Sequence, residues 1–394
     1  MNFRKRCQFG PNPAADWASK MVLNPAMVRD PVERDTIHML FRATGPKAGN
    51  RIPGRPLPYP IFLGYAVSHD CGVHWECDWS RPALAPGLKQ NPRDLIVTDV
   101  FGRRMFDYSN GCIEDPRLFY FEDVLYLTVA CRAFPPGPYW EHDDPVQCMP
   151  ASVRSTAQDF GRAVAENSSV SLLYKVELDA LKTGHYENAF SFVAPLHRPD
   201  VSDDRDVVLF PRPLRIGGTE KIVCIHRPKT PWNYDVGKGL TVPSIFMALG
   251  NSLSDFYDGT AEEFVFARPE FPWEADRIGA SWAPLELEPG IWLLPYHGKQ
   301  DDAVGYTQSF MLLRETGTGL PEITARPGER ILYASEKWEL EGDFTIPCLF
   351  SWSGLLLDDG YLLMGYGAAD TKVGTATVEL DTLYHYLTQR GDRL

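Results

Sequence analysis

The sequence predicts an all-β protein with the architecture of a five-bladed β-propeller. Three observations predict it: long helical periodicity is scarce, short apolar and aromatic runs alternate with Gly, Pro, Asp and Asn, and one two-strand pattern recurs five times. With 394 residues, 44% of them hydrophobic, the chain can bury a large core. We therefore expect repeated sheets arranged around one axis.

The repeated unit is an apolar strand that ends in a small polar cluster. Its copies are IHMLFRA (37–43), LYLTVACRA (125–133), KIVCIHRP (221–228), IWLLPYHG (291–298) and YLLMGYGAAD (361–370). Each copy follows another strand-like run, in order LNPAMV, EDPRLFYF, VVLFPRPLRI, SWAPLELE and PCLFSWSGLLL. Further strand-like sequence comes after each copy, so every unit holds three or four strands. The predicted single domain, 1–394, has approximate blades at 20–82, 108–200, 205–270, 278–330 and 343–387.

Helices and insertions are expected at the periphery. Short helices are predicted around 157–166 and 179–183. Insertions at 45–60 and 135–168 interrupt the repeat. Loops of this kind usually decorate the face of a scaffold that binds ligand.

Composition excludes several classes of partner. Asp and Glu number 52 against 39 Lys and Arg, giving a formal charge of −13, and no basic cluster is dense enough to follow a nucleic acid backbone. No run approaches the roughly 18 apolar residues of a membrane span. The first residues, MNFRKRCQFG, lack the apolar region of a secretory signal. We expect a cytoplasmic protein without nucleic acid or membrane partners.

Cysteine usage argues against a metal or disulfide framework. The 8 cysteines lie far apart, mostly in apolar runs, without a CxxC pair. His69, Cys71, His74 and Cys77 lie close together, but their spacing matches no common zinc site. Reduced core thiols are predicted, with no metal and no organic cofactor.

The repeat also predicts a site. In a propeller the innermost strands converge on a central pocket, so residues at equivalent strand ends become neighbours. The polar residues at these ends are Arg42, Arg132, Arg227, His297 and Asp370, joined by Glu114, Asp115 and Arg117 from GCIEDPRLFYF. Ion pairs between blades are the plain alternative. So many converging charges favour a functional site, because desolvating them for stability alone is inefficient.

Ordered motifs across residues 24–378 resemble glycoside hydrolase family 130, the inverting β-mannoside phosphorylases and related β-mannosidases. The motifs are NPA (24–26), FRA (41–43), GYAVSHDCGVHW (64–75), EDPRLF (114–119), RDVVLFPRPL (205–214), HRP (226–228), YHG (296–298), GDF (342–344) and YGAADT (366–371). The resemblance implies that Asp115 is the general acid and passes its proton through a hydroxyl of the bound sugar. Glu114 could supply a neighbouring charge that tunes this acid. Arg117 would orient Asp115 or hold a sugar hydroxyl, with an ion pair between blades as an equal alternative.

The resemblance further implies a phosphate site and a mannose site. Arg132, Arg227 and His297 match phosphate-binding positions of the family, so inorganic phosphate is the expected co-substrate. Asp343 and Asp370 match mannose-binding positions of the family, and Arg42 and Asp70 have similar but weaker claims. As turn residues, Asp70 and Asp370 could instead cap local backbone groups. The expected reaction cleaves a non-reducing-end β-mannoside of an oligosaccharide and gives α-mannose 1-phosphate with inversion.

Aromatic residues could provide sugar-stacking platforms. Trp282 lies in GASWAPLEL, a segment in which many family members have a different sequence, and the resemblance places it near the pocket. Trp140, Trp232 and Tyr234 are further candidates. Each of them is alternatively a core residue. The resemblance leaves open the acceptor sugar, the β-1,4 or β-1,2 linkage, and assembly into a homo-oligomer.

Three alternatives remain at the level of sequence. The first is an inverting β-mannosidase in which Glu114, Glu286 or another pocket acid activates water, about 6.5 to 9.5 Å from the general acid. The second is a noncatalytic carbohydrate-binding propeller. The third is a propeller used as an interaction scaffold, without sugar affinity.

Overall fold

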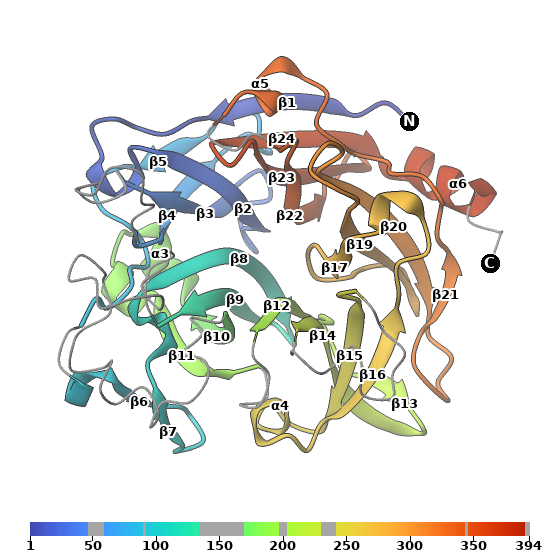
Figure 1. Cartoon of the computed structure of the whole chain (residues 1–394), viewed down its shortest axis with the longest axis horizontal. Helices are drawn as coiled ribbons and strands as arrows, with labels where there is room; N and C mark the ends of the chain where they lie inside the picture. Colours follow the sequence, from blue (N-terminus) through green and yellow to red (C-terminus); the bar gives the residue numbers. More distant parts are fainter. Residues whose placement is uncertain are drawn as a thin grey trace.

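The predicted all-β, five-bladed propeller is confirmed. The computed structural model describes residues 1–45, 59–89, 92–133, 169–196, 203–229, 242–342 and 346–390. Five antiparallel sheets surround a central axis, and the N-terminus and the last described helix, Leu380–Arg390, lie on the same side of the ring in the view of Figure 1.

Within each blade the first strand of the repeat lies nearest the axis (Figure 1). Blade I is formed by β2 (Met21–Arg29), β3 (Ile37–Thr44), β4 (Phe62–Ser68) and β5 (Glu76–Asp78). Blade II is formed by β8 (Cys112–Phe121), β9 (Val124–Arg132), β10 (Val170–Val176) and β11 (Phe190–Pro195). Blade III is formed by β12 (Asp203–Leu209), β14 (Thr219–Lys229), β15 (Ile245–Gly250) and β16 (Glu262–Ala267), with β13 (Leu214–Ile216) paired to β14.

The remaining two blades complete the ring. Blade IV is formed by β17 (Arg277–Ala280), β19 (Ile291–Lys299), β20 (Tyr306–Arg314) and β21 (Glu322–Ala325), with β18 (Leu285–Glu288) paired to β19. Blade V is formed by β22 (Leu349–Leu356), β23 (Tyr361–Ala368), β24 (Lys372–Glu379) and β1 (Arg4–Phe9). Because β1 pairs antiparallel with β24, the two ends of the chain share one sheet. The blade boundaries predicted from the repeat do not include β1.

Each pair of neighbouring blades shares a hydrophobic core. Successive side chains of a strand point to opposite faces, so one strand serves two cores. In β19, Leu293 packs toward blade V, whereas Trp292 and Leu294 pack toward blade III. Since both faces of a blade are covered, its strands read as continuous apolar runs such as IWLLPYHG.

Three inner strands carry the same backbone irregularity. In β2, β8 and β12 the register against the second strand shifts at a β-bulge. The bulges contain Asn24, Asp115 and Asp206, with φ of 50°, 58° and 60°. Asn and Asp tolerate the left-handed region better than most residues, because their short polar side chains can bond locally. Equivalent positions of blades I, II and III therefore hold an amide or a carboxylate.

The helices lie outside the blades. They are α3 (Leu178–Lys182), α4 (Asp255–Asp258), α5 (Lys337–Leu340) and α6 (Leu380–Arg390). Single 3₁₀ turns are η1 (Asp16–Ala18), η2 (Pro92–Leu95), η3 (Tyr108–Asn110), η4 (Tyr186–Asn188) and η5 (Pro272–Glu274). A two-stranded ribbon is formed by β6 (Ile96–Thr98) and β7 (Arg104–Phe106). The helix predicted at 179–183 is confirmed as α3, whereas the helix predicted at 157–166 and most of both insertions lie outside the described residues.

The described cysteines are free thiols. Cys112, Cys131, Cys224 and Cys348 are buried, as predicted for core thiols, whereas Cys7 is exposed. Cys148 lies outside the described residues. Across the described ranges, no helix is long and apolar enough to cross a membrane.

Candidate active site

A cavity of about 380 Å³ lies where the five blades meet. It contains five arginines and five carboxylates, so opposite charges are evenly matched. The lining residues are Asn24, Arg42, Glu114, Asp115, Arg132, Asp203, Arg205, Asp206, Arg227, Pro243, Arg277, Tyr306, Cys348, Phe350, Trp352 and Asp370. The structure thus brings together six predicted site residues: Arg42, Glu114, Asp115, Arg132, Arg227 and Asp370.

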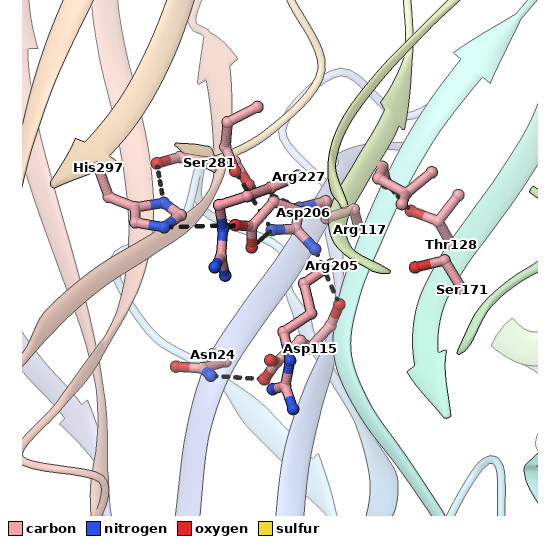
Figure 2. A network of polar contacts seen from close by, with 12 residues as sticks. Asn24, Asp115, Arg117, Thr128, Ser171, Arg205, Asp206, Arg227, Ser281 and His297 are labelled. Atoms are coloured by element: carbon pink, nitrogen blue, oxygen red, sulfur yellow. Dashed lines mark hydrogen bonds and ion pairs between the residues drawn. The ribbon is translucent and has the colours of Figure 1, made fainter. Parts of the chain in front are cut away.

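Asp115 is held through one of its two carboxylate oxygens. Asn24 Nδ2 donates to Oδ1 at 2.8 Å, and Arg42 Nη1 donates to the same oxygen at 3.0 Å. Figure 2 shows Asn24 directed toward Asp115 from the neighbouring blade. Among the described residues, these side-chain contacts use Oδ1 alone, which leaves Oδ2 available to a ligand.

Glu114 is a buried anion that holds the arginines. Its carboxylate pairs with Arg42 Nη2 at 3.0 Å and Arg132 Nη2 at 2.7 Å, and Arg205 Nη1 lies 3.9 Å away. Burial alone would raise the pKa of Glu114, but the three arginines outweigh it and lower the pKa to about 2. Glu114 is therefore ionised at neutral pH.

Asp370 has a contrasting environment. It follows β23, has a φ of 48° and accepts a hydrogen bond from the thiol of Cys348 at 3.6 Å. Burial raises the pKa of Asp370, and Arg42 opposes that rise only in part. The alternative role predicted for Asp370 was to cap local backbone groups. Its described hydrogen bond is instead with the thiol of Cys348, and its side chain lines the cavity.

Two further arginines extend the predicted cation set. Arg205 lies between Asp203, whose Oδ2 is 3.3 Å from its Nε, and Glu114. Arg277 reaches the cavity from the start of β17 and bonds Asp276 through Nε at 2.8 Å. Cations from blades I, II, III and IV therefore face one space, which suits an anionic ligand.

His297 and Arg117 lie behind the cavity wall and do not line it. His297 is fully buried, and its Nε2 is 3.4 Å from Asp206 Oδ2. Its ring packs against Phe350 at a centroid distance of 4.6 Å. Arg117 is 2% exposed and donates to Asp206 Oδ1 at 2.9 Å (Figure 2). Its guanidinium group also stacks on Trp352. Neither His297 nor Arg117 is therefore placed to contact phosphate or sugar directly in this structure.

Asp70 and Trp282 are also displaced from the predicted site. Asp70 is in the turn after β4, where it accepts from the backbone of Val73 and His74 and from His74 Nδ1 at 2.6 Å. Asp70 therefore caps local backbone groups, which is the alternative predicted for it. Trp282 is 4% exposed and belongs to the core between blades IV and V. The predicted candidates Asp343, Trp140, Trp232 and Tyr234 lie outside the described residues.

The aromatic wall of the cavity comes from residues that sequence reasoning missed. Phe350 and Trp352 alternate along β22 and stack with their rings 5.0 Å apart and 14° from parallel. Tyr306 packs on Phe350 at 4.3 Å. A run of ring faces suits the apolar face of a pyranose. The sequence SWS could have indicated this wall, because it lies in the inner strand of blade V at the register shift that corresponds to EDPR in blade II.

Asn24, Arg205 and Asp206 were missed for a related reason. All three lie within recognised motifs, NPA and RDVVLF, but the predicted site was read from the ends of the second strands. Reading the bulges of the first strands would have found them. The described residues contain no group of three His, Cys, Asp or Glu side chains placed to hold a metal ion.

An axial cavity of this kind, with an acid, a ring of arginines and an aromatic wall in a five-bladed propeller, is the architecture of a carbohydrate-active enzyme. The chain belongs to glycoside hydrolase family 130: the family model described as beta-1,4-mannooligosaccharide phosphorylase matches residues 185–389. The resemblance found in the sequence is thereby confirmed.

The proteins to which the chain is similar align over 47% to 98% of its length. The 1,2-beta-oligomannan phosphorylase of Thermoanaerobacter sp. (strain X514) is 24% identical over 372 residues, which are 94% of this chain and 94% of that protein. The beta-1,4-mannooligosaccharide phosphorylase of Ruminococcus albus is 29% identical over 187 residues, 47% of this chain and 50% of that protein. The structure of beta-1,2-mannobiose phosphorylase from Listeria innocua superposes with a TM-score of 0.61 at 16% identity, covering 98% of this chain and 99% of that one. At that identity the superposition supports the fold.

Proposed function

We propose that this enzyme is an inverting β-mannoside phosphorylase, which cleaves a non-reducing-end β-mannoside with inorganic phosphate and releases α-mannose 1-phosphate. Family membership and the phosphorylase names of its relatives support the proposal. The observation that carries it is a cavity with arginines around Asp115 and carboxylates that are mostly tied to those arginines. A cytoplasmic setting suits this reaction, because phosphate is plentiful there and a phosphorylated sugar is retained.

Asp115 is proposed as the proton donor. A glycosidic oxygen leaves poorly until it is protonated, so the reaction needs a positioned acid. Asn24 and Arg42 both donate hydrogen bonds to Oδ1, so Oδ2 is the oxygen proposed to carry and release the proton. The proton passes to the leaving oxygen through a hydroxyl of the bound sugar, as the family resemblance implies.

The nucleophile is proposed to be phosphate because the tied carboxylates are poor bases. Glu114 has a pKa of about 2, and Arg227 and His297 help to hold the pKa of Asp206 well below its usual range despite burial. Glu286 lies away from the cavity and pairs with Arg212. Phosphate is already anionic and requires no protein base. Arg132, Arg205 and Arg227 supply the charge that holds it beside the anomeric carbon.

The mannosyl unit is proposed to bind between Asp370 and the aromatic wall of Tyr306, Phe350 and Trp352. Asp370 and Arg42 offer an acceptor and a donor for sugar hydroxyls. Asp343 remains a predicted mannose ligand. The relatives are named for β-1,2 and β-1,4 linkages, so both linkages belong in the test.

One observation favours a second candidate, an inverting β-mannosidase. Asp370 is a cavity carboxylate whose pKa is raised by burial, and its described hydrogen-bond donor is the thiol of Cys348. Such a carboxylate could accept a proton from water. This candidate predicts cleavage without phosphate that is abolished in Asp370→Asn.

The proposal is tested with purified protein and a panel of β-1,2- and β-1,4-linked mannosides, with and without inorganic phosphate. Mannose 1-phosphate and free mannose are both assayed. We expect mannose 1-phosphate only when phosphate is present. We also expect a loss of about 100-fold to 10,000-fold in Asp115→Asn. Asp70→Asn is the matched control, because it makes the same change in a turn outside the cavity and should leave the rate unchanged.

Two results would count against phosphorolysis. Free mannose at equal rates with and without phosphate would identify the hydrolase. Sugar binding without turnover, unchanged in Asp115→Asn, would identify a noncatalytic carbohydrate-binding propeller.

A further inference from the structure

We propose that Asp206 is a positioning residue that aims Arg227 into the cavity, so that Arg227 can bind phosphate. The inference rests on the proposed phosphorylase function and adds to it a residue that need not touch either substrate. Its basis is a buried cluster built from blades II, III and IV around the Asp206 carboxylate (Figure 2).

Asp206 divides its two oxygens between two arginines. It is 3% exposed and lies in the bulge of β12. Oδ1 accepts from Arg117 Nη2 at 2.9 Å, and Oδ2 accepts from Arg227 Nε. Neither oxygen is shared between the two cations, so the carboxylate sets the position of both guanidinium groups.

The contact with Asp206 uses only the Nε side of Arg227. Among the described residues, no hydrogen bond involves the two Nη atoms of Arg227, whose side chain lines the cavity. A planar guanidinium fixed through Nε presents its Nη groups as a fork, which matches two oxygens of a phosphate. Arg117 differs, because it also donates to the carbonyl oxygens of Ser281 and Ala280.

Blade IV fixes Asp206 from the other side. His297 Nε2 is 3.4 Å from Oδ2, and the ring is fully buried. Gly279 lies against the same oxygen: a Cβ at this position would be 2.1 Å from Asp206 Oδ2 and 2.9 Å from His297 Nε2. Glycine is therefore required for the carboxylate to take its observed position. The positions of Gly279 and His297 decide where Asp206 lies, and Asp206 decides where Arg227 points.

Gly279→Ala tests the proposal without changing any charge. The added methyl group must displace the Asp206 carboxylate, and with it Arg227. We expect the KM for phosphate to rise about tenfold, as for loss of one oriented charged contact. The KM for the mannoside and the kcat at saturating phosphate should stay within about twofold. Calorimetric titration of inorganic phosphate should show the same loss of affinity without turnover.

Asp206→Asn is the second variant, in case Gly279→Ala does not fold. Asparagine keeps one acceptor but places an N–H₂ donor against the other arginine, so Arg227 should again be misaligned. Gly354→Ala is the matched control. Its Cβ would meet the core side chain of Trp282 at 2.2 Å, so it should lower thermal stability without raising the KM for phosphate.

The outcomes separate this inference from the function beneath it. In one outcome the wild-type enzyme needs phosphate, and the variants lose stability but keep the same KM for phosphate. Asp206 would then serve only in structural ion pairs between blades, and the inference alone would be overturned. A wild-type enzyme that neither needs nor binds phosphate would overturn the proposed function and the inference with it. A selective rise in the KM for phosphate supports both.

Discussion

Single carboxylates in the cavity have opposite effects on stability. Asp115 and Asp206 lie in backbone conformations that non-glycine residues rarely adopt, and Glu114 is buried between arginines. Strain and buried charge persist at functional sites when the surrounding structure holds them in place. The effect of each carboxylate on the stability of the fold therefore depends on the groups that contact it.

Asp370→Asn should stabilise the fold at neutral pH while weakening mannoside binding. The pKa of Asp370 is raised by burial, so its contribution to stability is present below the unfolded pKa and is lost as pH rises through the folded pKa. At pH 7, which is above the unfolded pKa, the raised pKa of Asp370 therefore opposes folding. We expect a higher Tm for the variant at pH 7, and a difference that shrinks toward pH 3.

Asp70→Asn provides the control of opposite sign. Hydrogen bonds from His74 and Ser68 outweigh the effect of burial and lower the pKa of Asp70 to about 2. Asp70 therefore stabilises the fold above its unfolded pKa, and the benefit is lost as pH falls toward 2. Its variant should have a slightly lower Tm at pH 7. Equal shifts in both variants would contradict the environments assigned to these two residues.

Glu114→Gln should destabilise the protein strongly. The change removes the buried counter-ion of Arg132 and one of the two carboxylates that Arg42 contacts, the other being Asp115. Breaking a buried pair costs about 3–5 kcal/mol. Because the pKa of Glu114 is lowered to about 2, its contribution is present above the unfolded pKa near 4.5 and fades as pH falls toward 2. Urea unfolding at pH 7 and pH 3.5 measures both effects.

Glu286→Gln is the matched control for this change. Glu286 also pairs with an arginine, but its side chain is 31% exposed. Exposed pairs contribute about 0–1 kcal/mol, so this variant should remain close to the parent protein. A Glu114→Gln variant as stable as Glu286→Gln at pH 7 would show that the arginines do not depend on Glu114.

At the scale of elements, β1 joins the two ends of the chain in one blade. Arg4 to Phe9 pair with β24, and Lys5 Nζ donates to the carbonyl oxygen of Tyr333, to Ser335 Oγ and to Glu339 Oε2. We expect deletion of residues 1–9 to lower the Tm sharply and to broaden the unfolding transition, because blade V loses its outer strand.

Two lysine variants check whether this closure depends on specific contacts. Lys5→Met removes the ion-pair partner of Glu339, a fully buried carboxylate, whereas Lys337→Met removes a lysine that is 85% exposed. Only the first should lower the Tm by several degrees. A truncated chain with an unchanged Tm would mean that β1 does not close the ring.

The strands that could be predicted from the sequence are those that are buried on both faces. Strands such as β19 and β23 are apolar along their length, and their spacing identified the blades. By contrast, β1 reads RKRCQF and is half exposed, so no local pattern separates it from a charged loop. Its partner is more than 360 residues away, at Val373–Thr377, and only the closed ring shows the pairing.

The candidate site was predictable where a strand end faces the axis. Arg42, Arg132, Arg227 and Asp370 line the cavity as the repeat implied. His297 occupies a comparable strand end, but Phe350 packs on its ring and Asp206 lies between it and Arg227. Repeat position gives the direction of a side chain, whereas its accessibility depends on how neighbouring blades pack. That packing is not encoded in any one repeat.

At the scale of the whole molecule, the ring of blades is what makes the chemistry possible. Each blade contributes at least two residues to the cavity, and the proposed acid Asp115, the groups that hold it and the arginines come from different blades. Fixed donors and charges around a cavity can stabilise a transition state without reorganising during the reaction. Cleavage of the mannoside therefore depends on closure of the entire ring.

The origin of the oxygen that becomes bonded to the anomeric carbon tests phosphorolysis most directly. We would supply fully ¹⁸O-labelled inorganic phosphate with a β-mannoside in ordinary water and analyse the products by mass spectrometry. Attack by phosphate predicts α-mannose 1-phosphate that retains every labelled oxygen, including the one that bridges phosphorus and sugar. Unlabelled free mannose with the labelled phosphate left unconsumed would contradict phosphorolysis and show that water is the nucleophile.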